Sequence, residues 1–363
     1  MTDATRVITG GVDTHKDFHV AAALDELGRL IGTETFPTTT SGYQALHAWL
    51  TGHGQLGAVG VEGTGAWGAG LARFLTAREV KVVEVCRPNR QHRRRHGKSD
   101  TADAIGAARS VLAGEAAGAP KSANGGVEAI RLLRIARRSA MKARTQAANQ
   151  LHAVVVTAPD PIRQPLTGLH INALVERVHR MRPGPVTEPT AAAKLALVVL
   201  ARRWKQLSDE IAMLDGHLDE LTTTTAPTLV ALNGVGAQTA AVLLTAAGDN
   251  PDRLYSEGSF AALCGSSPID ASSGRRNDRH RLNRGGDRQA NSALYIIVLS
   301  RLRWHPETQR YMARRLAQGK TRKEVIRCLK RYIAREVHHA ITVDFTASRQ
   351  HRDARHEPLL EAA

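Results

Sequence analysis

The sequence is poor in several residue types that often mark a structural or binding site on their own. Its 363 residues include three cysteines, and these are too scattered for a disulfide framework or a cysteine-based zinc site. Aromatic residues make up 4% of the chain, too few for base stacking to dominate recognition of a single strand. No run of about 18 apolar residues is present, so we expect no membrane-spanning helix. The first residues show no signal-peptide pattern, and a cytoplasmic protein is expected.

Acidic residues are also in deficit. Lys and Arg number 50 against 34 Asp and Glu, which gives a formal net charge of +16. Such an excess indicates a polyanionic partner, nucleic acid in the first place. The length leaves room for two or three domains with real cores.

Four of the scarce acids stand where a metal site can be built. Asp13 ends the first apolar run of the chain and Glu62 ends a later one. Asp100 and Asp103 lie one helical turn apart at the start of a helical pattern. Oxygen-only clusters suit Mg²⁺ or Mn²⁺, and acids beside basic runs indicate metal-assisted chemistry on a phosphodiester. A structural alternative remains for single members, since Asp13 can cap a turn and Asp100 can favour a helix N-terminus.

Residues 1–120 read as an α/β domain. We predict strands over residues 7–13, 18–24, 29–36, 58–62 and 81–85, and helices over 41–50, 67–77 and 100–112. Three strands in a meander, followed by alternating helix and strand, is the order of the RNase H/RuvC-like fold. The four acids fall where that fold has its metal site.

Residues 121–225 are dominated by two long helical patterns, over about 127–156 and 191–221. They predict an antiparallel coiled-coil arm that mediates oligomerisation through an apolar stripe including Leu207, Ile211 and Leu214. A helical bundle packed on the core fits the same pattern, and both interpretations stay open.

Residues 226–345 form a third, mainly helical region. Gly234 and Gly236 precede an Ala-rich helix, a pattern typical of a helix-hairpin-helix whose backbone N–H groups hold a phosphate. A simple glycine turn between packed helices is the alternative. Further on, Ser272 and Ser273 stand directly before Gly274 in an arginine-rich segment. Residues 346–363 are polar, and we expect a disordered tail.

Two basic clusters accompany these features, and both are predicted to contact phosphates, which positions a nucleic acid without reading its sequence. A solvated basic loop is the alternative for the first. The clusters are Arg93, Arg94, Arg95 and Lys98, and Arg275, Arg276 and Arg279.

The motifs together resemble a known family, the DEDD serine recombinases (transposases) of bacterial insertion sequences in the insertion-sequence-110 class. The segments that carry the resemblance occur in the family's order over residues 7–310. They are residues 11–16, 61–65, 98–104, 232–249, 264–274 and 284–287.

The resemblance implies more than the spacing does. It implies a RuvC-like metal domain with Asp13, Glu62, Asp100 and Asp103, and a C-terminal domain whose serine attacks DNA. By position that serine is Ser273, with Ser272 as the alternative. Arg275 and Arg276 follow where the family more often has Gly or Lys, a departure that affects phosphate contacts more than the nucleophile.

The implied partners are double-stranded DNA of the element ends and the target, a structured guide RNA, and further copies of the chain in a dimer or tetramer. The implied location is the bacterial cytoplasm, at the nucleoid when active. Two other functions remain as alternatives: a junction-resolving metal-dependent nuclease, and a non-catalytic nucleic-acid-binding relative. The serine-bearing region argues against the first, and the four acids argue against the second.

Overall fold

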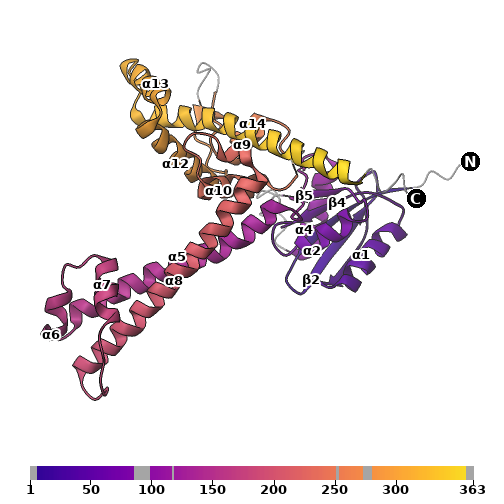
Figure 1. Ribbon diagram of the computed structural model, residues 1–363. Helices are drawn as coiled ribbons and strands as arrows, with labels where there is room; N and C mark the ends of the chain where they lie inside the picture. The colour runs from indigo at the N-terminus through magenta and orange to yellow at the C-terminus, as the bar shows by residue number, and fades with distance from the viewer. Residues whose placement is uncertain (1–5, 86–98, 117, 251–252, 273–279, 357–363) are drawn as a thin grey trace, which may run out of the picture. The chain divides into compact units, whose positions relative to one another are not determined.

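The computed structural model describes residues 6–85, 99–116, 118–250, 253–272 and 280–356 of the chain (Figure 1). The chain divides into two compact units. The first comprises residues 1–123 together with 247–255, and the second comprises residues 124–246 and 256–363. Among the described residues, no helix has the length and apolar character needed to cross a membrane.

The first unit is built on one mixed sheet of five strands in the order β3-β2-β1-β4-β5. The antiparallel pairs are β1–β2 and β2–β3, and the parallel pairs are β1–β4 and β4–β5. All five predicted strands are confirmed. Their bounds are Val7–Thr14 (β1), Phe18–Leu24 (β2), Leu30–Pro37 (β3), Gln55–Glu62 (β4) and Val82–Val85 (β5).

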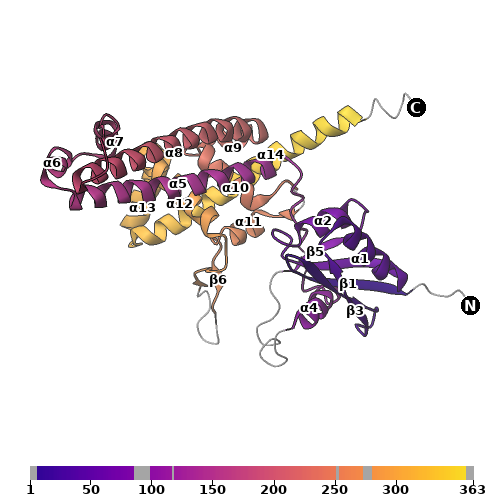
Figure 2. The same cartoon turned by 90° about the horizontal axis from the view of Figure 1, so that it is seen from below.

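Helices cover both faces of this sheet (Figure 2). Helices α1 (Thr40–Gly52) and α2 (Ala69–Thr76) lie on one face, where Ile8 and Val12 join the main core cluster. Helix α4 (Asp100–Leu112) lies on the other face, where Ala104 packs with Val20 and Ala22. Because side chains alternate along a strand, β1 directs its even-numbered positions to α1 and α2 and its odd-numbered positions to α4.

Two consecutive glycines let helices approach β1 closely. A Cβ on Gly11 would lie 2.2 Å from the carbonyl oxygen of Ala104 and 2.3 Å from the amide nitrogen of Ala108. A Cβ on Gly10 would lie 3.0 Å from Leu50 on the opposite face. Only glycine leaves room for the α4 backbone at position 11, so this residue sets how near the start of α4 comes to the end of β1.

The second unit contains an antiparallel pair of long helices, α5 (Gly126–Thr157) and α8 (Pro189–Thr225). The start of α5 meets the end of α8, where a Cβ on Gly126 would lie 2.6 Å from Thr225. About three turns further along, Arg137 on α5 forms an ion pair with Asp215 on α8. The antiparallel pair that the sequence predicted is therefore present.

The other end of the pair carries a small core of its own. Short helices α6 (Asp160–Arg163), η1 (Gln164–Leu166) and α7 (Ile171–His179) pack there on the end of α5 and the start of α8. The apolar stripe of α8 is occupied within the chain, since Ile211 and Leu214 are each 5% exposed.

The remainder of the second unit is mainly helical, as predicted. Its elements are α9 (Pro227–Val230), α10 (Ala237–Ala247), α11 (Glu257–Leu263), β6 (Ile269–Asp270), β7 (His280–Arg281), α12 (Arg288–Trp304), α13 (Pro306–Ala317) and α14 (Arg322–His356). The buried Asp344 of α14 accepts hydrogen bonds from the backbone N–H groups of Thr228 and Leu229, which fixes the first turn of α9.

Helix α14 continues to His356, so residues 346–356 are helical where the sequence led us to expect a disordered tail. This stretch is polar but holds neither proline nor glycine. The low apolar content of residues 346–356 led to the prediction of disorder, but these residues can still form a helix because none of them breaks one. The rest of the expected tail, residues 357–363, lies outside the described residues.

Candidate metal centre

The end of β1 supplies the first two side chains of the candidate site. Asp13 is 8% exposed, and by strand alternation it lies on the α4 face of the sheet, two positions after Gly11. His15 follows in the turn to β2, where its backbone N–H donates to the carbonyl oxygen of Phe18 at 3.1 Å. This turn brings His15 Nε2 within 3.2 Å of Asp13 Oδ2.

The start of α4 supplies the acids on the opposite side. Ser99 caps this helix, since its hydroxyl accepts a hydrogen bond from the Ala102 N–H at 3.2 Å. Asp100 and Asp103 lie in the first turn, where the helix dipole favours negative charge. Asp100 Oδ2 lies 3.4 Å from His15 Nε2.

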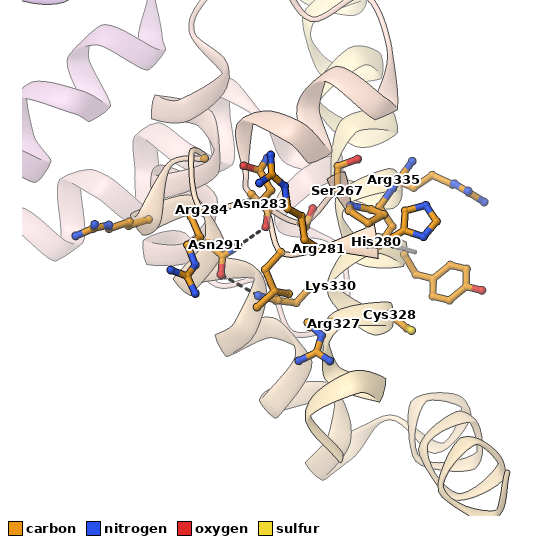
Figure 3. A pocket seen from close by; sticks show the side chains of 18 of the residues that line it. Ser267, His280, Arg281, Asn283, Arg284, Asn291, Arg327, Cys328, Lys330 and Arg335 are labelled. Atoms are coloured by element: carbon orange, nitrogen blue, oxygen red, sulfur yellow. Dashed lines mark hydrogen bonds between the residues drawn. The ribbon is translucent and has the colours of Figure 1, made fainter. Parts of the chain in front are cut away.

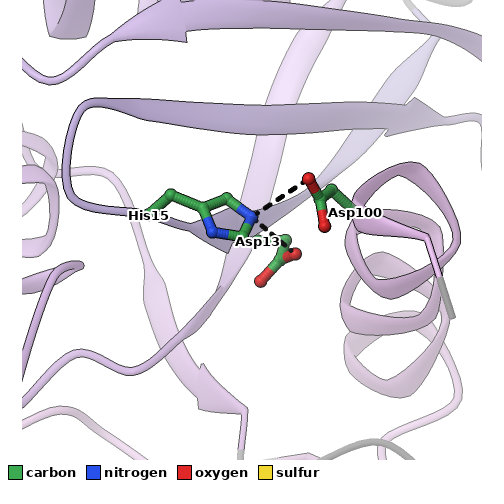
Figure 4. A group of neighbouring side chains, drawn as sticks. All are labelled: Asp13, His15 and Asp100. Carbon is green, nitrogen blue, oxygen red and sulfur yellow. Dashed lines mark ion pairs between the residues drawn. The ribbon is translucent and has the colours of Figure 1, made fainter.

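These side chains converge on one point (Figure 4). One ligand atom each from Asp13, His15 and Asp100 lies within 4.8 Å of the others. The imidazole of His15 stands between the two carboxylates. Two carboxylate oxygens and one imidazole nitrogen at this spacing can hold a divalent cation.

The electrostatics of Asp13 agree with a cation site. Burial raises the pKa of Asp13 above its usual value, the nearby His15 lowers it, and the charges of Asp103 and Asp100 raise it again. Asp103 is 5% exposed. Acids gathered in a poorly solvated place repel one another, and a bound divalent cation relieves both the repulsion and the desolvation.

Glu62 occupies the end of the next strand in the sheet. It ends β4, whose Val61 pairs with Val12 of β1, and the Thr14 hydroxyl donates to the Glu62 carbonyl oxygen at 2.8 Å. Its carboxylate is not in the three-residue group. The structure therefore brings Asp13 and Asp100 together and places Asp103 near enough to affect Asp13. The position of Glu62 at the end of the neighbouring strand β4 keeps it a predicted ligand.

The turn after Glu62 is held by a side-chain network. The buried Thr64 donates its hydroxyl hydrogen to Glu84 Oε1 at 2.8 Å. Glu84 Oε2 in turn accepts from Arg253 Nη2 at 3.2 Å. Arg253 also donates to the backbone carbonyls of Ala119 and Ala247. An arginine remote in sequence thus fixes the strand and the turn beside Glu62.

The predicted nucleophile and most residues predicted to contact phosphates fall outside the part of the chain that the structure describes. Ser273 lies outside the described residues, as do Arg93, Arg94, Arg95, Lys98, Arg275, Arg276 and Arg279. Ser272 is described: it is exposed after β6, and its backbone N–H donates to Asp270 Oδ1 at 2.8 Å.

Two features of the glycine turn before α10 disfavour the binding of an anion. Gly234 adopts a left-handed conformation with φ of 78°, but the Gly236 N–H already donates to the Thr239 hydroxyl at 3.0 Å. A cavity beside the turn is lined by the carboxylate-bearing Asp215 and Asp219, which would repel a phosphate. The phosphate-binding role of Gly234 and Gly236 stays a prediction.

Two residues that shape the candidate site, His15 and Arg253, were not predicted from the sequence. His15 stands two residues after Asp13, and alternation along an extending strand was the signal that could have placed both on one face. Arg253 carried no such signal, because only the folded chain brings it to Glu84.

Comparison with known proteins adds independent information. Residues 10–158 match a family model described as a transposase, the DEDD transposase of IS110. Residues 226–313 match a second model, described as the transposase IS116/IS110/IS902 family. The chain is also 31% identical over 147 residues to the insertion element IS110 uncharacterized 43.6 kDa protein of Streptomyces coelicolor. That match covers 40% of this chain and 34% of the relative, about a third of the relative's length.

Proposed function

The chain belongs to the IS110 family of transposases, and from this premise we propose that it cuts and rejoins DNA strands as the recombinase of an insertion sequence. The observation that carries the proposal is the convergence of Asp13, His15 and Asp100 at the end of β1. The basic charge of the chain supports a polyanionic substrate.

The fold that we propose for the first unit is RNase H/RuvC-like. The order β3-β2-β1-β4-β5, with three antiparallel strands followed by two parallel ones, supports it. So does the distribution of the acids over the end of β1, the end of β4 and the first turn of α4.

The cofactor that we propose is Mg²⁺ or Mn²⁺. Asp13 and Asp100 would hold it, with His15 as a third ligand or as the hydrogen-bond donor that orients both carboxylates. Asp103 adds negative charge beside Asp13, and Glu62 at the end of β4 would complete the set. Such a cation polarises a scissile phosphate and stabilises the charge that develops on it.

The covalent step that we propose uses Ser273, with Ser272 as the alternative. The serine oxygen attacks phosphorus, a new Oγ–P bond forms, and the bond from phosphorus to the leaving strand's oxygen breaks. The proton of the serine hydroxyl is transferred, directly or through water, to that leaving oxygen. A phosphoserine keeps the phosphodiester energy, so the strands can be rejoined without ATP.

The partners that we propose are the element ends, the target DNA, a structured guide RNA and further copies of the chain. Support for a guide is indirect. Aromatic residues are scarce, so base stacking by the protein contributes little, and phosphate contacts alone carry no sequence information.

The test is a recombination assay on plasmids that carry the element ends and a target, with and without the element's own RNA. Asp13→Asn should reduce strand cleavage by about a hundredfold or more, because it removes a charged ligand. Asp17→Asn is the matched control: Asp17 is exposed and lies outside the cluster, and its activity should match the unmodified protein. Full activity in Asp13→Asn would refute the metal centre.

The nucleophile is tested in the same assay by trapping protein–DNA adducts. Ser273→Ala should abolish adducts and recombination, whereas Ser272→Ala should retain both. The reverse pattern would reassign the nucleophile to Ser272. Cleavage that survives both substitutions without an adduct would make the protein a metal-dependent nuclease, and recombination without RNA would refute guidance.

A further inference from the structure

The second unit contains a cavity of about 1020 Å³ at the base of the β6–β7 hairpin (Figure 3). One wall is the segment before β6, with Ser266 and Ser267, and another is formed by β7 and the residues that follow it. Helices α12, α13 and α14 supply the remaining side chains. No function assigned above uses this cavity.

The lining of the cavity is strongly basic. Four cationic side chains come from α14, at Arg327, Lys330, Arg331 and Arg335. Arg281 and Arg284 approach from the hairpin side, and Arg288 and Arg315 add to the charge. None of the described residues that line the cavity is acidic. Glu257, outside the lining, neutralises part of this charge through ion pairs with Arg331 and Arg335.

Two of these guanidinium groups have buried nitrogens left without a partner. Arg315 Nε and Arg331 Nη1 are buried, and neither has a hydrogen-bond acceptor among the described residues. A buried charged donor that lacks an acceptor costs free energy. The oxygens of a phosphodiester are the acceptors that a guanidinium group fits best.

Lys330 is held in place inside this charged environment. Its ammonium donates to Asn291 Oδ1 at 2.8 Å, and Asn291 Nδ2 donates to the carbonyl oxygens of Cys264 and Gly265. Burial, followed by the charge of Arg327, lowers the pKa of Lys330. A bound anion would favour the ammonium form and offset the repulsion among the neighbouring cations.

We propose that this cavity binds the phosphodiester backbone of a nucleic-acid strand. Its volume lies at the upper end for ligand sites, larger than a lone phosphate needs. Tyr311 and Tyr332, which line it and meet edge to face at 5.7 Å between ring centroids, offer apolar surface to a sugar or base. The cavity lining includes residues on both sides of the β6–β7 hairpin, among them Ser267 and His280.

The inference rests on the proposed function in taking nucleic acid as the ligand, and its test avoids any dependence on cutting. Affinity for a short random-sequence DNA duplex and for a single-stranded RNA of equal length is measured in EDTA over a salt series. The cavity variant is Arg315→Gln/Arg327→Gln. The matched control is Arg322→Gln/Lys323→Gln, which removes the same charge from two exposed residues outside the cavity lining.

In a plot of log affinity against log salt concentration, each lost phosphate contact makes the slope shallower by about 1. For the strand that occupies the cavity, the slope of the cavity variant should therefore be shallower by about 2. The slope of the control variant should change less. A loss with DNA alone identifies DNA as the occupant, and a loss with RNA alone identifies RNA. Equal slopes for cavity and control variants with both probes overturn the proposal.

The melting temperature without nucleic acid separates binding from folding. Because Arg315→Gln/Arg327→Gln reduces repulsion, its midpoint should not fall below that of the control. If it does fall, Arg281→Gln/Arg284→Gln replaces it, since both residues are exposed. An unchanged slope in that second variant also overturns the proposal. Loss of cutting in Asp13→Asn with normal binding would leave the cavity assignment intact.

Discussion

At the scale of single residues, Gly11 helps to position the candidate site although it supplies no ligand. It lets the α4 backbone lie against β1, and α4 carries Asp100 towards Asp13. Gly11→Ala should push α4 outward, destabilise the first unit by about 1–3 kcal/mol, and separate Asp100 from Asp13. Hydrogen exchange of the α4 amides should become faster, and activity should fall although no ligand is changed.

The same helix offers a matched control for that substitution. Gly106 lies in the middle of α4, and a Cβ there would meet nothing within 4 Å. Gly106→Ala should therefore stabilise α4 by up to about 1 kcal/mol through helix propensity and leave activity unchanged. If both alanine variants slow exchange in α4, the close approach at Gly11 does not position the helix.

At the scale of elements, sequence patterns predicted backbone structure better than side-chain convergence. Apolar runs located all five strands, and three- and four-residue spacings located α5 and α8, because both depend on local periodicity. Which acids meet depended on packing that no local pattern encodes. His15 enters the cluster through the turn between β1 and β2, which a periodic pattern does not describe.

The apolar stripe on α8 shows in the same way that residue spacing predicts an apolar face but not what packs against it. Its spacing predicted a surface for subunit contact, but burial of Ile211 and Leu214 within the chain gives these residues an intramolecular role. Leu214→Asp should destabilise the α5–α8 pair by about 3 kcal/mol or more, because it removes apolar packing and buries a charge. Helical signal in thermal melting and hydrogen exchange along α5 would report the loss.

Met213 is the control for that experiment, since it is adjacent in sequence and 57% exposed. Met213→Asp should cost less than about 1 kcal/mol, mostly from helix propensity. Equal destabilisation by the two substitutions would contradict the packing of α8. Oligomerisation through another face of the arm stays a prediction, and light scattering on the Met213→Asp variant would show whether that face takes part.

At the scale of the whole molecule, the first unit is discontinuous in sequence. Residues 247–255 return to it, where Asn250 accepts from the Ser122 N–H and donates to the Pro120 carbonyl oxygen, and Arg253 pairs with Glu84. A fragment of residues 1–123 should therefore melt at a lower temperature than the same fragment joined by a flexible linker to residues 247–255. Identical melting temperatures would show that the returning segment adds no stability.

This discontinuity also bears on the order in which the protein is made. Domains tend to fold from the N-terminus while synthesis continues, so the five strands and α4 can form early on the ribosome. Glu84 and the turn after Glu62 must wait for Arg253, which emerges only after the whole α5–α8 pair has been translated. A chain cut short before residue 253 therefore lacks the guanidinium group that holds Glu84 and, through Glu84, the Thr64 side chain in the turn after Glu62.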